Sequence, residues 1–133
     1  MSEVKPDFAA FARAYEEGRP QALYVRHVAD LETPVSAFLK LGEGRENAFL
    51  LESVQGGEAR GRYSIIGLKP DLIWRARGDL AEINRRAVSD PNRFEPLPQK
   101  PLASLRALVA ETRMTLPEGL PPMAAGLFGY LGY

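Results

Sequence analysis

The sequence predicts an α+β fold made mainly of antiparallel sheets flanked by helices. Several short apolar runs rich in β-forming residues follow one another, with Gly-rich or Gly-Asp turns between them, as in β-hairpins. Other stretches carry apolar residues at helical spacing. Helices and strands do not alternate in the regular βαβ order of a parallel sheet, so antiparallel pairing is favoured.

Composition narrows the class of protein. A length of 133 residues favours one domain spanning 1–133, and 17 basic residues balance 17 acidic residues. A neutral chain has no net field to attract nucleic acid or an anionic membrane, so neither is expected as a partner. The chain has no cysteine, and its N-terminus lacks the apolar core of a secretory signal. We therefore expect a cytoplasmic protein.

The first two elements are a helix and a strand. Asp7 precedes Phe8, Phe11 and Tyr15, whose spacing predicts a short helix with these aromatic residues facing inward, ended by Gly18. Residues 22–28 are rich in β-formers and predict a strand. That stretch contains His27, the only histidine, which we interpret as a structural residue because no second potential ligand or base is patterned with it.

A second helix and two pairs of strands follow. Thr33 and Pro34 form a helix start, and the predicted helix covers 34–41. The runs 48–51 and 63–67 predict neighbouring strands joined by a Gly-rich loop. A second hairpin is predicted from the strands 72–77 and 80–85, with Gly78 and Asp79 at the turn.

The last third of the chain is rich in proline and glycine. Four prolines between 89 and 101 predict a surface connection that belongs to no sheet or helix. A helix is predicted over 101–113, with Ser104 and Arg106 on its outer face. Residues 123–133 carry no charge and have glycines every third position, which predicts a buried strand. If this strand is left uncovered, we expect it to drive self-association.

Catalytic signatures are missing from the sequence. Gly56 and Gly57 are not followed by the Lys-Ser/Thr of a phosphate loop, and no metal-spaced His/Asp/Glu set occurs. We expect no catalytic and no metal-binding residue in this chain. The residues alone therefore indicate a binding or scaffolding piece.

Three segments, in their order and spacing, resemble the N-terminal region of anthranilate synthase component I. They are Leu50-Leu51-Glu52-Ser53, Arg62-Tyr63-Ser64-Ile65-Ile66-Gly67, and the glycine-rich run 125–133. The resemblance implies the fold of chorismate-utilising enzymes and a chain that is the first portion of a longer enzyme. Family members are lyases that convert chorismate and ammonia to anthranilate and pyruvate in tryptophan biosynthesis, using Mg²⁺ and a glutamine amidotransferase partner. The resemblance places the chorismate and magnesium ligands outside this chain, which alone is expected to be inactive.

The resemblance also implies a site for feedback inhibition by L-tryptophan. Its expected residues are Leu51, Glu52, Ser53, Arg62 and Tyr63. Glu52 would accept from the ligand's ammonium group, while Leu51 and Tyr63 would flank the indole ring. Some relatives carry a lysine where Arg62 or Tyr63 stands, so either of these two is a candidate contact. Two alternatives remain open, a region of aminodeoxychorismate synthase component I and a free-standing amino-acid-binding regulatory domain.

Overall fold

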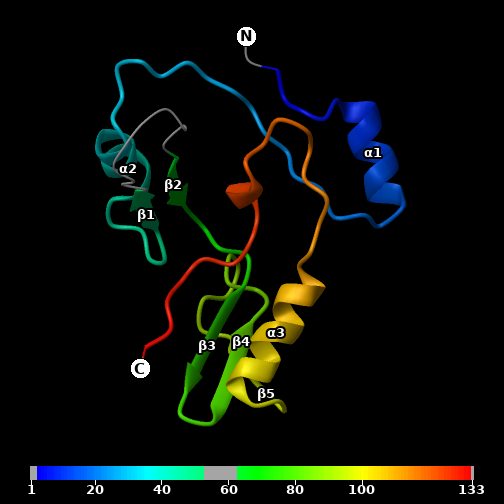
Figure 1. Cartoon of the computed structure of the whole chain (residues 1–133), viewed down its shortest axis with the longest axis vertical. Helices are drawn as coiled ribbons and strands as arrows, with labels where there is room; N and C mark the ends of the chain where they lie inside the picture. The colour runs from blue at the N-terminus through cyan, green and yellow to red at the C-terminus, as the bar shows by residue number, and fades with distance from the viewer. Residues whose placement is uncertain (1–2, 53–62, 133) are drawn as a thin grey trace. The chain divides into compact units, whose positions relative to one another are not determined.

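The computed structural model describes residues 3–52 and 63–132, and it confirms an α+β architecture with antiparallel sheets (Figure 1). The chain divides into two compact units, Met1–Val28 with Leu102–Tyr133, and Ala29–Pro101. All the described strands that pair in a sheet lie in the second unit. None of the helices in the described ranges is long and apolar enough to cross a membrane.

A two-stranded sheet lies in the second unit. Strand β1 (Phe49–Glu52) pairs antiparallel with β2 (Ser64–Gly67), which confirms the predicted neighbouring strands. Helix α2 (Pro34–Gly42) lies against both strands. The helix ends at Gly42, where a Cβ would lie 2.7 Å from the Phe38 ring, so the close approach of that ring requires glycine.

Position 67 requires glycine because of its partner in the opposite strand. It lies opposite Phe49, and a Cβ at this position would lie 2.1 Å from Cε1 of that ring. Glycine weakens a strand, because it loses more chain entropy on folding and has no side chain to pack. An aromatic ring over a cross-strand glycine offsets this loss, and here it fixes the register of β1 on β2.

The other sheet of this unit has three strands in the order β3 (Ile73–Arg77), β4 (Leu80–Asn84), β5 (Glu95–Leu97), all antiparallel. The β3–β4 hairpin confirms the prediction, and Gly78 at its turn has a φ of +56°, which favours glycine. Ala81 and Ile83 share one face of β4 and are each 3% exposed. These two residues belong to the small apolar core of the described chain.

Strand β5 corrects the prediction that 89–101 belongs to no sheet. Pro96 lies in the middle of β5, opposite Glu82 of β4. Proline is compatible with a ladder where its nitrogen points away from the partner strand, which occurs at an edge. Because β5 is the outermost strand, the sheet tolerates this proline.

Asn84 at the end of β4 is fully buried. Its Nδ2 donates to the carbonyl of Asp90 at 2.7 Å, and its Oδ1 accepts from the backbone N–H of Arg86 at 2.8 Å. One side chain therefore satisfies two backbone groups of the connection between β4 and β5. This fixes the path of the proline-rich segment, as buried polar groups generally require partners.

The first unit contains α1 (Phe8–Glu16), α3 (Pro101–Glu111) from Leu102 onward, and the 3₁₀ turn η1 (Pro122–Ala124). Asp7 caps α1 by accepting from the backbone N–H of Ala10 at 2.8 Å, as predicted. The prediction that the aromatic face of α1 points inward is wrong for Phe8 and Tyr15, which are 82% and 73% exposed, whereas Ala14 is buried.

Helix α3 is also confirmed, but its buried side differs from the prediction. Ser104 is 3% exposed, so its placement on the outer face is wrong. Ser104 and Leu108, four residues apart, form the buried stripe of the helix. Hydrophobicity alone misplaced this stripe, because a serine hydroxyl is small enough to be buried when it has a partner.

The predicted strand at 22–28 is wrong. Tyr24 forms an isolated antiparallel bridge with Lys5, with two backbone hydrogen bonds of 2.9 Å, and the run does not extend into a strand. Further along, the Arg26 guanidinium donates to the carbonyl of Gly119. The β-forming run 22–28 therefore makes one bridge and a side-chain hydrogen bond to a distant loop, and not the ladder of a strand.

The predicted buried strand at 123–133 is also wrong over its described part. After η1, residues 125–132 form no strand, and Tyr130 is 95% exposed. A Cβ at Gly126, Gly129 or Gly132 would have no heavy atom within 4 Å. No described backbone therefore packs closely against these glycines, and the described residues supply no strand that pairs with this run.

Candidate functional site

The predicted tryptophan site falls at the Glu52–Ser64 end of the β1–β2 ribbon, where the chain leaves β1 and later enters β2. Leu51 and Glu52 are the last two residues of β1, and Tyr63 directly precedes β2. Glu52 lies opposite Ser64, and Leu51 lies opposite Ile65. Ser53 and Arg62 lie outside the described residues. The structure thus brings three of the five residues to one end of one ribbon.

Strand geometry divides the described residues between two faces. Neighbouring residues of a strand point to opposite faces, and residues opposite each other share one. Leu51 and Ile65 therefore share one face of the ribbon, whereas Glu52 and Ser64 share the other. Leu51 and Tyr63 are both half-exposed, at 49% and 52%. A ligand on one face of the paired strands would meet Leu51 or Glu52 but not both.

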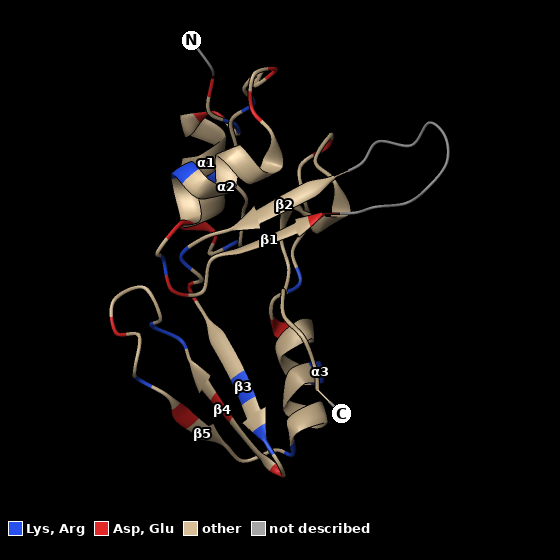
Figure 2. Cartoon of the chain, turned by 90° about the vertical axis from the view of Figure 1, so that its left-hand side faces the viewer, with Lys and Arg blue, Asp and Glu red and all other residues tan. Residues whose placement is uncertain are grey.

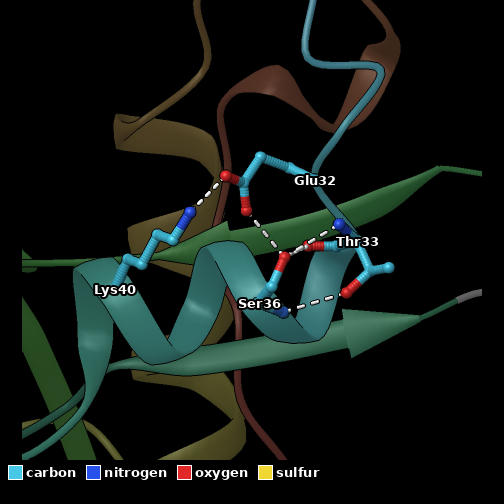
Figure 3. A network of polar contacts seen from close by, with 4 residues as sticks. All are labelled: Glu32, Thr33, Ser36 and Lys40. Atoms are coloured by element: carbon cyan, nitrogen blue, oxygen red, sulfur yellow. Dashed lines mark hydrogen bonds and ion pairs between the residues drawn. The ribbon is translucent and has the colours of Figure 1, made fainter.

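Helix α2 runs beside β1 in the opposite direction (Figure 3). Its last residue, Gly42, comes close to Leu68, directly after β2, at the end of the ribbon where Phe49 begins β1. Its first turn consequently lies toward the end of β1 that carries Leu51 and Glu52. Anything that fixes the start of α2 also supports this end of the ribbon.

The start of α2 is fixed by four side chains (Figure 3). The Thr33 hydroxyl accepts from the backbone N–H of Ser36 at 3.0 Å, and the Ser36 hydroxyl accepts from the backbone N–H of Thr33 at 2.9 Å. This reciprocal pair is a capping box, in which a serine takes the place of the more common glutamate or glutamine. The Ser36 hydroxyl also donates to Glu32 Oε2 at 2.7 Å, and Lys40 donates to Glu32 Oε1.

The sequence analysis found Thr33 and Pro34 but missed Glu32, Ser36 and Lys40. A signal for the capping box was present, because Ser36 stands three residues after Thr33. The Glu32 to Lys40 contact spans eight residues and has no comparable local signal, since Glu32 precedes the helix.

The Glu32 carboxyl has a lowered pKa. The hydrogen bond from Lys40 is the largest cause, followed by the hydrogen bond from Ser36. Both donors stabilise the charged carboxylate, so its folded pKa lies below its unfolded value. A lowered carboxyl pKa contributes stability above the unfolded pKa, and this contribution is lost as the pH falls through the folded pKa.

We therefore expect the Glu32→Gln variant to be less stable than the unmodified chain at neutral pH. The difference should shrink as the pH falls into the acidic range, because the unmodified chain then also loses its carboxylate. Urea unfolding from neutral to acidic pH, followed by circular dichroism, measures this. Glu43→Gln, at an exposed residue just after α2, is the matched control, and a Glu32→Gln effect independent of pH would contradict the assignment.

The described residues contain no group of three His, Cys, Asp or Glu side chains placed to hold a metal ion. The Glu52–Ser64 end of β1–β2 carries a carboxylate, a hydroxyl and the two half-exposed apolar side chains of Leu51 and Tyr63.

This α+β chain has clear sequence relatives. Anthranilate synthase component 1 of Cereibacter sphaeroides is 56% identical over 126 residues, covering 95% of this chain and 25% of the relative. The Synechocystis protein of the same name is 40% identical over 133 residues, covering 98% of this chain and 25% of the relative. The Pseudomonas aeruginosa protein is 42% identical over 106 residues, covering 80% and 21%. No protein-family model and no solved structure matches the chain.

The relatives share one name, and the part of them that matches is an N-terminal region. The chain belongs to the anthranilate synthase component 1 family. It spans about a quarter of the length of the curated relatives that it matches.

Proposed function

We propose that this chain is the tryptophan-sensing N-terminal region of an anthranilate synthase component 1. The observation that supports this most is the 56% identity with the Cereibacter protein over 95% of the chain. The longer enzyme would be a cytoplasmic lyase of tryptophan biosynthesis that converts chorismate and ammonia to anthranilate and pyruvate. The ammonia would come from a glutamine amidotransferase partner, and the residues for chorismate and Mg²⁺ would lie in the remainder of the enzyme.

The proposed ligand of this region is L-tryptophan, bound at the Glu52–Ser64 end of the β1–β2 ribbon. A ligand that lies beyond the last pair, Glu52 and Ser64, can contact groups from both faces of the ribbon. There the Glu52 carboxylate would accept from the ammonium group, and Leu51 with Tyr63 would pack against the indole ring. Ser53 and Arg62 would supply further polar contacts. Half-exposed apolar side chains beside a carboxylate fit a zwitterion that carries a flat apolar ring.

The test is an activity assay on the full-length enzyme with chorismate, Mg²⁺ and ammonium, followed by anthranilate fluorescence. We expect anthranilate formation that tryptophan inhibits, and no anthranilate from the 133-residue chain alone. Anthranilate formed without tryptophan inhibition would refute the sensing role and leave the enzyme class intact. An aminated chorismate that retains its pyruvyl group would instead favour the aminodeoxychorismate synthase alternative.

We also propose that the isolated chain associates with copies of itself through residues 123–132. Five large apolar side chains of this uncharged segment are exposed, namely Met123, Leu127, Phe128, Tyr130 and Leu131. Adjacent exposed apolar side chains favour association, because contact removes them from water. Sedimentation velocity should show dimers or larger species that Leu131→Glu reduces, and a clean monomer at high concentration would contradict the proposal.

A further inference from the structure

A small depression lies beside the connection between β4 and β5. Its volume is about 190 Å³, and its lining consists of Asn84, Arg85, Arg86, Arg93 and Glu95. Three arginines and one glutamate thus line a single hollow. Figure 2 shows basic and acidic ribbon in the stretch between β4 and β5. We call this hollow the arginine depression.

The backbone that carries the arginines is held in place by hydrogen bonds. The buried Asn84 side chain bonds the N–H of Arg86 and the carbonyl of Asp90. The N–H of Asp90 donates to the carbonyl of Arg86 at 2.7 Å, and the N–H of Arg93 donates to the carbonyl of Asp90 at 3.3 Å. A site positioned by a fixed backbone loses less entropy when a ligand binds than a site on a loose loop.

The charges of Arg86 and Arg93 are only weakly compensated by described residues. Arg93 Nε lies 3.7 Å from Glu95 Oε1, and both side chains are at least half-exposed, so this ion pair contributes little. The guanidinium of Arg86 forms no ion pair with any described residue. Arg86 and Arg93 therefore have donor groups with capacity for a further acceptor.

We propose that the arginine depression binds the oxyanion group of a small ligand, a phosphate or a carboxylate, through the guanidinium groups of Arg86 and Arg93. The planar guanidinium presents paired N–H donors that match two oxygens of either group. Pockets for drug-sized ligands measure about 300–1,000 Å³, so a hollow of this size suits one ionic group. The depression lies on the three-stranded sheet, in elements separate from those of the predicted tryptophan site.

The test is an amide-shift titration of the ¹⁵N-labelled 133-residue chain by NMR. The probes are inorganic phosphate and acetate, each added at constant pH and ionic strength with chloride as the replaced anion. We expect saturable shifts at residues 85–93 with at least one probe, and the probe that saturates identifies the anion class. In Arg86→Gln/Arg93→Gln the apparent Kd should rise at least tenfold.

The matched control is Arg13→Gln/Arg77→Gln, which removes two exposed positive charges outside the depression. It should retain the affinity of the unmodified chain, whereas a loss equal to that of the first double variant would indicate a non-specific charge effect and overturn the proposal. Saturation by neither probe, or unchanged affinity in Arg86→Gln/Arg93→Gln, would also overturn it. The single variant Arg86→Gln keeps the backbone N–H that donates to Asn84 Oδ1, so it tests the proposal if the double variant does not fold.

Discussion

Ser53→Phe in the full-length enzyme is expected to leave anthranilate synthesis active and to weaken inhibition by tryptophan at least tenfold. Under the proposed function, the phenyl ring fills space that the ligand needs at the end of β1, directly after Glu52. A tenfold rise in the inhibition constant corresponds to about 1.4 kcal/mol of lost binding free energy. Initial rates measured against tryptophan concentration give the inhibition constants of both enzymes.

Ser89→Phe is the matched control for this prediction. Ser89 is exposed on the connection after β4, so the same change in volume occurs there away from the β1–β2 ribbon. Its inhibition constant should equal that of the unmodified enzyme. Equal constants for Ser53→Phe as well would mean that Ser53 only caps the loop, and thermal denaturation would then show a cost in stability instead.

Asn84→Leu is expected to destabilise the chain by about 1–3 kcal/mol. The leucine has the same branching but leaves the Arg86 N–H without the acceptor that Asn84 supplies, whereas the Asp90 carbonyl keeps the hydrogen bond from the Arg93 N–H. One unsatisfied buried backbone group costs about 1–3 kcal/mol. Urea unfolding followed by circular dichroism measures the change in the free energy of unfolding.

Asn92→Leu makes the same substitution at an exposed position of the same connection. The Asn92 N–H donates to the Asp90 side chain and its carbonyl accepts from the Phe94 N–H, and the substitution keeps both backbone groups. Its effect should stay within about 0.5 kcal/mol. Similar losses in both variants would show that the connection tolerates no leucine at either position, and that the buried hydrogen bonds of Asn84 are not the cause.

The elements that were predicted correctly have local signals. Asp7 and Thr33 cap helices because their oxygens accept from backbone N–H groups three residues ahead, so the capping residue and the donor that it satisfies lie in one short stretch. The β3–β4 hairpin likewise follows from a Gly-Asp turn between two β-type runs. Sequence reasoning succeeds where the residues that decide the structure are neighbours in the chain.

The predictions that failed concern strands whose pairing partners are distant in the sequence or absent from the described residues. Residues 22–28 have β-forming composition, but their described pairing is one bridge to Lys5. Residues 125–132 are apolar throughout and form no strand. The composition of a strand does not encode its neighbour, and a ladder forms only where a second strand supplies the other half of each hydrogen bond.

The position of the predicted site residues in the fold follows only partly from the sequence. Leu50, Leu51 and Glu52 end a strand that pairs with the next one, as predicted. The division of Leu51 and Glu52 between two faces follows from strand alternation once the register is known. The contribution of α2 was missed, because the contact between Glu32 and Lys40 depends on how the chain enters the helix.

Pro96 makes one outer edge of the three-stranded sheet less suited to pairing with a further strand. The sheet has two outer strands, β3 and β5, and an outer strand normally exposes backbone donors to which a further strand can add. The centre of β5 has no N–H to offer, since Pro96 occupies it and points its nitrogen away from β4. A strand added to the described sheet would therefore form a more complete hydrogen-bond ladder beside β3 than beside β5.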